Sequence, residues 1–428
     1  MREQHSGRAA VAAVWRIESA RIVGALARYT GDFAFAEDVA QEALADALVT
    51  WPREGVPANP AGWLLTVGRR RAVDAFRRRA ALDERYAAFA HGLGEGGAYS
   101  GGAPVDDDGD LPWDPDQIDD DVAALIFTAC HPVLSKEARV ALTLRVVGGL
   151  TSDEIARAFL VPTATVQARI TRAKKTLAAA RVPFAVPPAD QRGERFGSVL
   201  SVVYLIFTEG AAAGTGPGPI RLDLATEAQR LARVLARLAP DEPEANGLLA
   251  LLELTAARFP ARTAADGTPV LLEQQDRRRW DRAAIARGRA ALARAEAAGR
   301  GLGAYGLQAA IAECHAVAPS VAATDWDRIV LLYEALGRLA PSPVVELNRV
   351  VAVSMARGPA AALPLADELE RSGALDGSHL LPTVRGELLT RLGRTAAARA
   401  ELERALDLCR GESERTVLRR KLAALPAD

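Results

Sequence analysis

Residues 148–177, GGLTSDEIARAFLVPTATVQARITRAKKTL, constrain the fold of this chain more than any other segment. Thr151 followed by Glu154 is the signature of a capping box, which predicts that a first helix spans about 152–159. Pro162 cannot lie inside a continuing helix, so a second helix is expected to begin near Thr163. Two short helices around the turn at 160–162 are the layout of a DNA-reading helix-turn-helix.

The second of these helices has one apolar face and one free face. The apolar positions recur at i, i+4, i+7 and i+11 and are Val166, Ile170, Ala173 and Leu177. The other positions combine side chains suited to base edges with cations suited to phosphates, and they are Thr165, Gln167, Ala168, Arg169, Thr171, Arg172 and Lys175. The alternative is a solvated basic helix in an ordinary bundle.

Composition indicates an all-α protein of several domains. A chain of 428 residues exceeds one typical core, so two to four domains are expected. The chain is rich in alanine, 49% hydrophobic and only 5% aromatic, which favours helices over sheets. Nothing suggests a parallel-sheet enzyme.

Charge is segregated along the chain although the formal net charge is only −1. Residues 93–121 contain ten acidic and no Lys or Arg residues, whereas residues 122–183 contain nine basic and three acidic ones. Gly, Asp and Pro dominate the acidic stretch, which predicts an irregular linker.

Three scattered cysteines predict no disulfide framework. The pairs Cys130-His131 and Cys314-His315 each lack a second pair at ligand spacing, so buried packing cysteines are expected, with no metal and no cofactor. No signal peptide or 20-residue apolar run is seen, so we expect a reduced, cytoplasmic setting and no membrane partner.

The expected organisation is a helical unit over 9–92, the acidic linker over 93–121, the helix-turn-helix unit over 122–183 and a helical extension over 191–428. The segment PFAVPPAD at 183–190 marks the last boundary. Residues 386–408 place small and large residues as in a tetratricopeptide helix pair, at Gly386, Gly393, Ala398, Leu402 and Ala405. A generic helical bundle is the alternative for this extension.

Two segments of the first unit carry the remaining chemistry. In residues 32–48, Ala36, Ala40, Ala43 and Ala47 define an inner face, and Glu37, Asp38, Gln41 and Glu42 define an outer one. That acidic stripe either docks a basic partner or is simply solvated. In residues 57–80, Pro60 suits the first turn of a helix that carries Trp63 and two arginine clusters, as a DNA backbone and an unstacked strand require.

In this order, the segments AEDVAQEA, PAGWLLTVGRRRAVD and LTLRVVGGLTSDEIARAFLVPTATVQARITRAKKTL resemble the extracytoplasmic-function sigma factors, a class of RNA polymerase specificity subunits. The segments VLSVVYLIFTEG, QDRRRWDRAAI, LQAAIAECHA and PSPVVELNRVVAV resemble the subgroup with a long tetratricopeptide-like extension. The resemblance implies a fold of two small helical sigma domains joined by an acidic linker and followed by a helical repeat domain.

The resemblance also implies partners and site residues. Glu37, Asp38, Gln41 and Glu42 would bind a coiled coil of the largest subunit of core RNA polymerase. Asn59, Trp63, Arg69, Arg70, Arg77 and Arg78 would bind the promoter −10 element, the first two near a flipped base. Thr165, Gln167, Ala168, Arg169, Arg172 and Lys175 would read the −35 element as duplex.

The linker either threads through positively charged channels of the polymerase or is a solubilising spacer. Residues 191–428 contain no nucleophile-base pair or phosphate loop, so no enzyme activity is expected, and their repeats are expected to bind a protein regulator and modulate the sigma core. Their loop at 265–280 is expected to clamp neighbouring helices or to line a pocket. The competing functions are a stand-alone helix-turn-helix regulator and an enzyme with a regulatory DNA-binding end.

Overall fold

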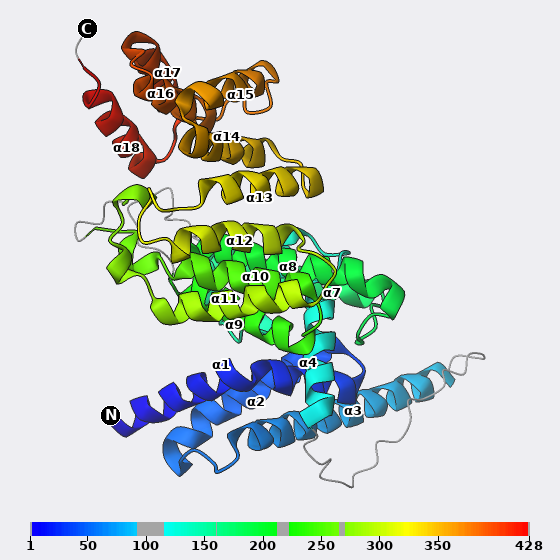
Figure 1. Cartoon of the computed structure of the whole chain (residues 1–428). Coiled ribbons are helices and arrows are strands. Elements are labelled where there is room, and N and C mark those ends of the chain that lie inside the picture. Colours follow the sequence, from blue (N-terminus) through cyan, green and yellow to red (C-terminus); the bar gives the residue numbers. More distant parts are fainter. Residues whose placement is uncertain (1, 92–114, 160, 212–221, 265–269, 427–428) are drawn as a thin grey trace. The chain divides into compact units, whose positions relative to one another are not determined.

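A computed structural model describes residues 2–91, 115–159, 161–211, 222–264 and 270–426. Within these ranges the chain forms 18 α-helices and three short 3-10 helices, and no β-strand occurs among them (Figure 1). The all-α prediction is confirmed. The chain divides into two compact units, residues 1–202 and 203–428, and the boundary lies inside helix α8 (Ala189–Ala211) rather than at the proline-rich segment 183–190.

The first unit begins with three helices that pack on one another, α1 (Arg2–Thr30), α2 (Phe33–Glu54) and α3 (Pro60–His91). The predicted inner face of α2 is confirmed, because Ala36, Ala40, Ala43 and Ala47 are all buried. Asp32 caps α2 by accepting hydrogen bonds from the backbone N–H groups of Ala34 and Phe35.

Helix α4 (Pro115–Ala129) begins inside the stretch for which sequence predicted irregular structure, so that prediction is wrong for residues 115–121. The helix packs on α1. Asp121 is buried there with its Oδ2 3.3 Å from Arg28 Nε, and burial raises the pKa of its carboxyl. Gly24 permits the approach, since a Cβ on it would lie 3.1 Å from that of Asp121. The rest of the predicted linker, residues 93–114, lies outside the described residues.

The helix-turn-helix follows as α5 (Lys136–Val146), α6 (Ser152–Phe159) and α7 (Thr163–Ala179). The start of α8 packs on the same unit, because Arg139 Nη1 donates to Ser198 Oγ at 2.9 Å and Arg195 Nη2 donates to the Phe127 carbonyl at 3.1 Å. The compact unit therefore extends past residue 183, the end that sequence predicted.

The second unit is a succession of helices in which each element packs on the next (Figure 1). It contains α9 (Leu222–Leu238), α10 (Pro243–Ala256), η1 (Phe259–Ala261), η2 (Leu272–Gln274), η3 (Arg277–Arg279), α11 (Arg282–Ala297), α12 (Ala304–Val317), α13 (Trp326–Leu339), α14 (Pro343–Arg357), α15 (Pro359–Arg371), α16 (Leu380–Arg391), α17 (Thr395–Leu408) and α18 (Glu412–Ala423).

The helix pair predicted for residues 386–408 forms as α16 and α17. Gly386 lies against Leu402, since a Cβ on it would be 2.7 Å from Leu402 Cγ, and Gly393 turns the chain between the helices with φ of +71°. Ala398, Leu402 and Ala405 are buried. These residues occupy the packing positions that sequence assigned to them.

Candidate nucleic-acid interface

The helix-turn-helix forms with the local chemistry that its sequence predicts. Thr151 N–H donates to Glu154 Oε2 at 2.8 Å, and Glu154 N–H donates to Thr151 Oγ1 at 3.1 Å, which completes the capping box. Thr163 Oγ1 donates to Asp153 Oδ1 at 2.8 Å and joins the two helices across the turn. The first helix spans the predicted residues 152–159, and the second begins at Thr163.

Helix α7 buries one face and leaves the other free. The four predicted apolar residues, Val166, Ile170, Ala173 and Leu177, are all buried. Of the residues predicted to bind the −35 element, Gln167, Ala168, Arg172 and Lys175 are exposed, whereas Thr165 and Arg169 are half-buried. The exposed set runs from Gln167 and Ala168 near the start to the cations Arg172 and Lys175 further along.

Helix α3 carries the second predicted set. Pro60 begins the helix as predicted, and Asn59 Oδ1 caps it by accepting from Gly62 N–H at 3.0 Å. The half-buried Trp63 packs edge-on against Trp51 at 5.5 Å between ring centroids. Asn59 and Trp63 thus have structural partners at the start of α3, where sequence expected them near an unstacked base.

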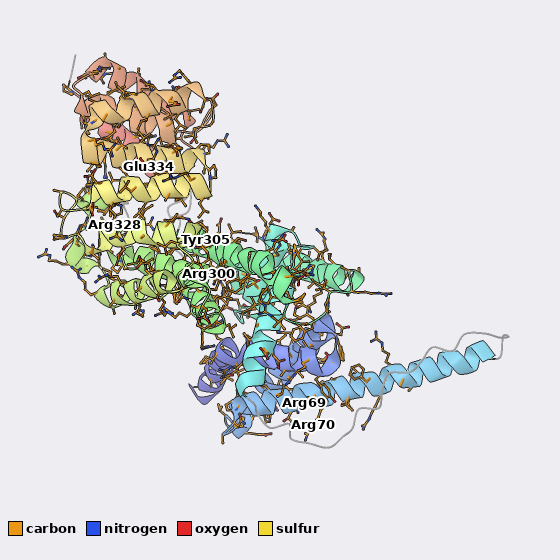
Figure 2. The ribbon with its side chains drawn as sticks, turned by 45° about the vertical axis from the view of Figure 1, so that its right-hand side comes forward. Arg69, Arg70, Arg300, Tyr305, Arg328 and Glu334 are labelled. Carbon is orange, nitrogen blue, oxygen red and sulfur yellow. The ribbon has the colours of Figure 1, made fainter. Side chains whose placement is uncertain are left out.

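The four arginines predicted to hold the DNA backbone are not equivalent. Arg70, Arg77 and Arg78 are exposed. Arg69, next to Arg70 on α3 (Figure 2), is half-buried, with its guanidinium 5.6 Å from the ring centroid of Tyr29 and a buried Nε without a hydrogen-bond partner. Arg69 therefore differs from the free backbone-binding cation that sequence predicted.

The acidic stripe of α2 is only partly a free surface. Asp38 and Glu42 are exposed and Gln41 is half-buried. Arg71 binds Asp46 through two nitrogens, and its Nε lies 3.9 Å from Glu42 Oε2. The hydrogen bond to Asp46 raises the pKa of Arg71. The outward orientation predicted for Glu37 is wrong in this structure, because Glu37 is 3% exposed.

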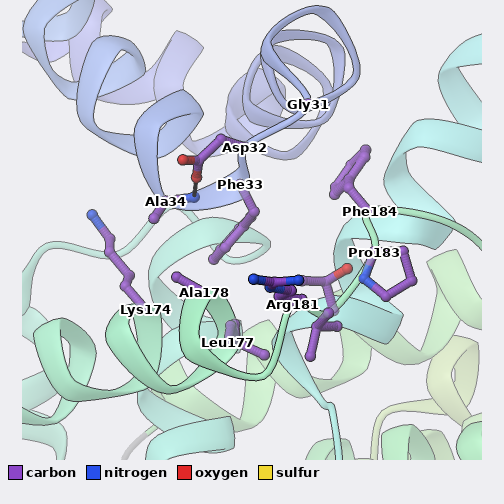
Figure 3. A pocket seen from close by; sticks show the side chains of 12 residues that line it. Gly31, Asp32, Phe33, Ala34, Lys174, Leu177, Ala178, Arg181, Pro183 and Phe184 are labelled. Carbon is purple, nitrogen blue, oxygen red and sulfur yellow. Dashed lines mark hydrogen bonds between the residues drawn. The ribbon is translucent and has the colours of Figure 1, made fainter. Parts of the chain in front are cut away.

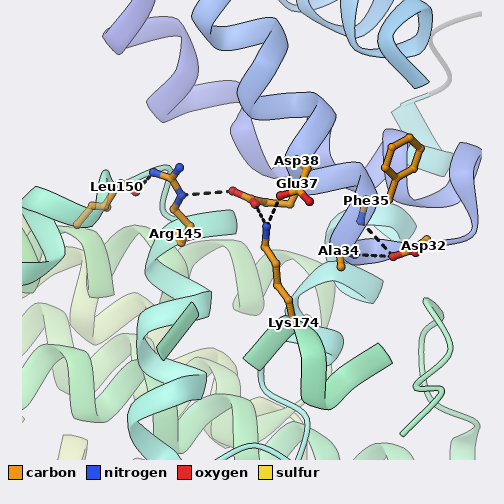
Figure 4. A network of polar contacts seen from close by, with 8 residues as sticks. All are labelled: Asp32, Ala34, Phe35, Glu37, Asp38, Arg145, Leu150 and Lys174. Atoms are coloured by element: carbon orange, nitrogen blue, oxygen red, sulfur yellow. Dashed lines mark hydrogen bonds and ion pairs between the residues drawn. The ribbon is translucent and has the colours of Figure 1, made fainter. Parts of the chain in front are cut away.

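Glu37 is buried because the helix-turn-helix covers it (Figure 4). Its carboxylate forms ion pairs with Lys174 of α7 and with Arg145 of α5, whose Nε lies 3.3 Å away. Lys174 also lies 2.6 Å from Asp38 Oδ1. Burial acts to lower the pKa of Lys174, but the two carboxylates outweigh it and raise that pKa.

Two further features accompany this contact. Arg16 of α1 lies 2.7 Å from Glu154 of the capping box.

A cavity of about 330 Å³ opens between the start of α2 and the end of α7 (Figure 3). Its lining residues include Asp32, Phe33, Lys174, Arg181 and Phe184.

Sequence reasoning missed Arg16, Arg145 and Lys174 as functional candidates. For Lys174 a signal was present, because it lies four residues after Ile170 and next to Ala173, at the border of the buried face of α7. A border position predicts partial burial, but not the carboxylate that it meets.

Comparisons with known proteins agree with this geometry. Residues 16–81 match Sigma-70 region 2, and residues 124–177 match Sigma-70, region 4. The chain belongs to the sigma-70 family. In this sigma factor α1 to α3 lie largely within region 2, and α5 to α7 lie almost entirely within region 4. Sigma-70 family domains imply that it binds core RNA polymerase and promoter DNA, and they point to a transcription factor rather than an enzyme.

Two further comparisons involve proteins without a known function. Residues 195–296 match a family of unknown function, DUF6596. Over 418 residues, 95% of this chain and 93% of the relative, the sigma factor is 43% identical to the uncharacterized protein R00370 of Rhizobium meliloti (strain 1021). No solved structure matches. Among the described residues, no helix combines the length and apolar character needed to cross a membrane.

Proposed function

We propose that this sigma-70 factor is of the extracytoplasmic-function type and directs promoter-specific initiation through α3 and α7. The observation that carries the proposal is the free face of α7, where Gln167, Arg172 and Lys175 are exposed on a helix whose opposite face is buried. A helix in this position of a helix-turn-helix enters the major groove, where its first residues reach base edges and its cations contact phosphates.

In this proposal α3 binds the melted −10 element. Arg70, Arg77 and Arg78 contact the backbone because they are exposed cations on one long helix, and Trp63 and Asn59 at its start contact the unstacked base. The Arg69 guanidinium packs on the Tyr29 ring of α1 instead of facing solvent, so its contribution to DNA binding is smaller than that of the exposed arginines.

Core polymerase docks on the acidic stripe of α2. Asp38 and Glu42 are exposed and form the accessible part, and Gln41 lies between them. Glu37 belongs to the same stripe but is engaged by Lys174 and Arg145, so docking at Glu37 requires region 4 to leave this contact. The chain then alternates between a closed state, in which α7 covers Glu37, and an open state in which the whole stripe is free to bind polymerase.

The second unit modulates this activity through its successive helix pairs, which form extended surfaces suited to a protein regulator. In vitro transcription from genomic DNA with core RNA polymerase tests the whole proposal. Full-length protein is expected to give defined start sites. A shortened chain should end near residue 202 rather than at the proline-rich segment, because Arg195 and Ser198 pack on the first unit.

The shortened chain reports whether the extension activates or restrains initiation. The matched variants are Arg172→Ala on the free face of α7 and Arg278→Ala, an exposed arginine of η3. Loss of defined start sites is expected only for the first. DNA binding without transcripts from any of these proteins would reject the proposal and favour a stand-alone regulator.

A further inference from the structure

Three arginines of the second unit converge in the irregular segment between α10 and α11. Arg258 precedes η1, Arg262 follows it and Arg277 opens η3. The backbone holds the segment together, since Asp281 N–H donates to the Ala257 carbonyl and Val270 N–H donates to the Arg262 carbonyl, both at 2.9 Å. Trp280 anchors it in a small core with Leu254 and Ile285.

None of these three arginines has a carboxylate partner among the described residues. Arg277 Nη1 donates to the carbonyls of His315 and Ala318 at the end of α12, at 2.5 and 2.7 Å. Arg262 Nη1 donates to the Ala211 carbonyl at 3.2 Å. Elsewhere in the same unit buried carboxylates hold arginines in pairs, as Glu253 holds Arg233 and Arg287.

Several polar groups at this place are buried without a hydrogen-bond partner in the described structure. They are Arg277 Nη2, Trp280 Nε1 and His315 Nδ1. Arg277 lies over the Trp280 ring at 4.6 Å from its centroid, and its Nη1 binds the His315 carbonyl, so all three residues are neighbours. Arg277 Nη2 and Trp280 Nε1 can only donate, and His315 Nδ1 can do so in one tautomer of the neutral ring. Buried donors are nearly always paired in native proteins, so these unpaired donors indicate a missing acceptor.

The lowered pKa values of Arg258 and His315 also indicate a missing anion. Burial, reinforced by Arg262 and Arg277, lowers the pKa of Arg258 to about 10. Burial, reinforced by Arg258 and Arg277, lowers the pKa of His315 to about 4. Unpaired positive charge in a low-dielectric environment disfavours further protonation, and an anion at the same place would reverse both effects.

Capping of α12 explains only part of the cluster. A cation near a helix C-terminus is stabilised by the unpaired carbonyl groups there, which accounts for the hydrogen bonds from Arg277 Nη1 to the His315 and Ala318 carbonyls. It does not account for Arg277 Nη2, for the Trp280 indole N–H or for Arg258, which receives no carbonyl or carboxylate partner within the described residues. Residues 270–280 contact the end of α12 through Arg277, as expected if the loop clamps neighbouring helices, but that role leaves these groups unused.

We propose that Arg258, Arg262 and Arg277, with Trp280 and His315, bind the phosphate group of a small anionic molecule. Each guanidinium group can donate two parallel N–H bonds to two oxygens of a phosphate. A doubly charged phosphate also neutralises three guanidinium charges better than a singly charged carboxylate does. The indole N–H and a neutral histidine Nδ1–H supply further donors. The site lies largely within the segment that matches a family of unknown function and does not depend on the sigma activity.

Inorganic phosphate is the first probe, added to the full-length protein against chloride and acetate at constant ionic strength. We expect phosphate to raise the unfolding temperature with a saturable concentration dependence, because a ligand that binds only the folded state stabilises it. Arg258→Gln should bind phosphate at least tenfold more weakly, and Arg262→Gln serves as the second variant if the first fails to fold. Arg278→Gln is the matched control, since that side chain is 90% exposed.

Histidine NMR supplies an independent readout. Saturating phosphate should move the titration of His315 upward by at least one pH unit, with the signal assigned by its loss in His315→Gln. Equal responses of the native protein and Arg258→Gln would overturn the site and attribute the effect to the exposed cations of α7. A larger response to acetate than to phosphate would overturn the proposed ligand class, and absence of any saturable response would overturn the site itself.

Discussion

Lys174 of the recognition helix forms an ion pair with Glu37, a residue of the acidic stripe on α2 that is 3% exposed. The two residues are 137 positions apart in the chain and come from two different sigma-70 regions. Arg145 holds the other oxygen of the same carboxylate, so region 4 covers the inner edge of the proposed polymerase-docking surface. In the proposed function, docking and this contact therefore compete for one carboxylate.

Lys174→Ala should strengthen binding to core polymerase, because it removes a cation that stabilises the closed state. Because Arg145 still pairs with Glu37 in this variant, the loss is comparable to that of a surface ion pair, about 1 kcal/mol, and the apparent affinity should rise by roughly fivefold. Fluorescence anisotropy of labelled protein titrated with core polymerase, without DNA, measures this affinity directly.

The adjacent Lys175→Ala is the control for that experiment, because Lys175 is exposed and forms no hydrogen bond or ion pair with α2 among the described residues. Its affinity for core polymerase should equal that of the native protein. Unchanged or weaker binding by Lys174→Ala would show that the contact does not restrain docking.

Gln167→Ala and Lys175→Ala should separate sequence reading from backbone binding on α7. Gln167 is exposed near the start of the helix, where side chains reach base edges, so its loss should cost about 1–3 kcal/mol on the preferred promoter and less on shuffled DNA. Loss of a phosphate contact at Lys175 should weaken binding to both DNAs alike and reduce the salt slope by about one. Holoenzyme binding measured at several salt concentrations distinguishes these patterns, and identical behaviour of the two variants would contradict the assignment.

The double variant Arg77→Ala, Arg78→Ala should reduce open-complex formation by roughly tenfold, because it removes two exposed cations from the helix proposed to hold the separated strand. Permanganate reactivity of promoter thymines measures strand opening. Arg71→Ala is the matched control on the same helix, since that guanidinium is already engaged by Asp46. A loss of strand opening as large in the control would point to damage of α3 rather than to a DNA contact.

Local chemistry allowed most elements of the candidate site to be predicted from the sequence. Pro60, the capping box at Thr151 and the four apolar positions of α7 act within one or two helical turns, so their effects can be deduced from spacing alone. The start of α4 could have been deduced in the same way. Pro115 suits a first helical turn, and apolar residues follow it at helical spacing in PDQIDDDVAALIF, but the aspartates masked this pattern.

The missed features depend on contacts between distant segments. Helical spacing places Glu37 at the border of the buried face of α2, four residues after Phe33, and Asp38 on the opposite side. The full burial of Glu37 requires the approach of α7 and α5, which spacing within α2 does not predict. The arginine cluster has the same origin, because Arg258 and Arg277 are brought together with His315 of another helix by an irregular loop. Such loops lack the hydrophobic periodicity from which helices are predicted.

Glu253→Gln should destabilise the second unit by about 3 kcal/mol, because it leaves two arginines without their buried carboxylate. Glu253 is 1% exposed and binds Arg233 Nε at 2.9 Å and Arg287 Nη2 at 3.0 Å. Urea unfolding followed by circular dichroism measures the change. Glu296→Gln on the exposed face of α11 should leave stability unchanged, and equal midpoints for the two variants would show that the pairs contribute little.

His315 should make the stability of the second unit depend on pH between about 6.5 and 4. Burial, together with Arg258 and Arg277, lowers its pKa from 6.5 to about 4 in the folded protein. The unfolded chain therefore binds a proton before the folded one, so this contribution is fully present above pH 6.5 and is lost as the pH falls toward 4. The total loss is about 3 kcal/mol.

Urea unfolding at a series of pH values in phosphate-free buffer measures this loss. The urea midpoint should fall between pH 6.5 and 4 for the native protein and for the control His379→Gln, and should fall less for His315→Gln. Parallel curves for all three proteins would exclude His315 as the source.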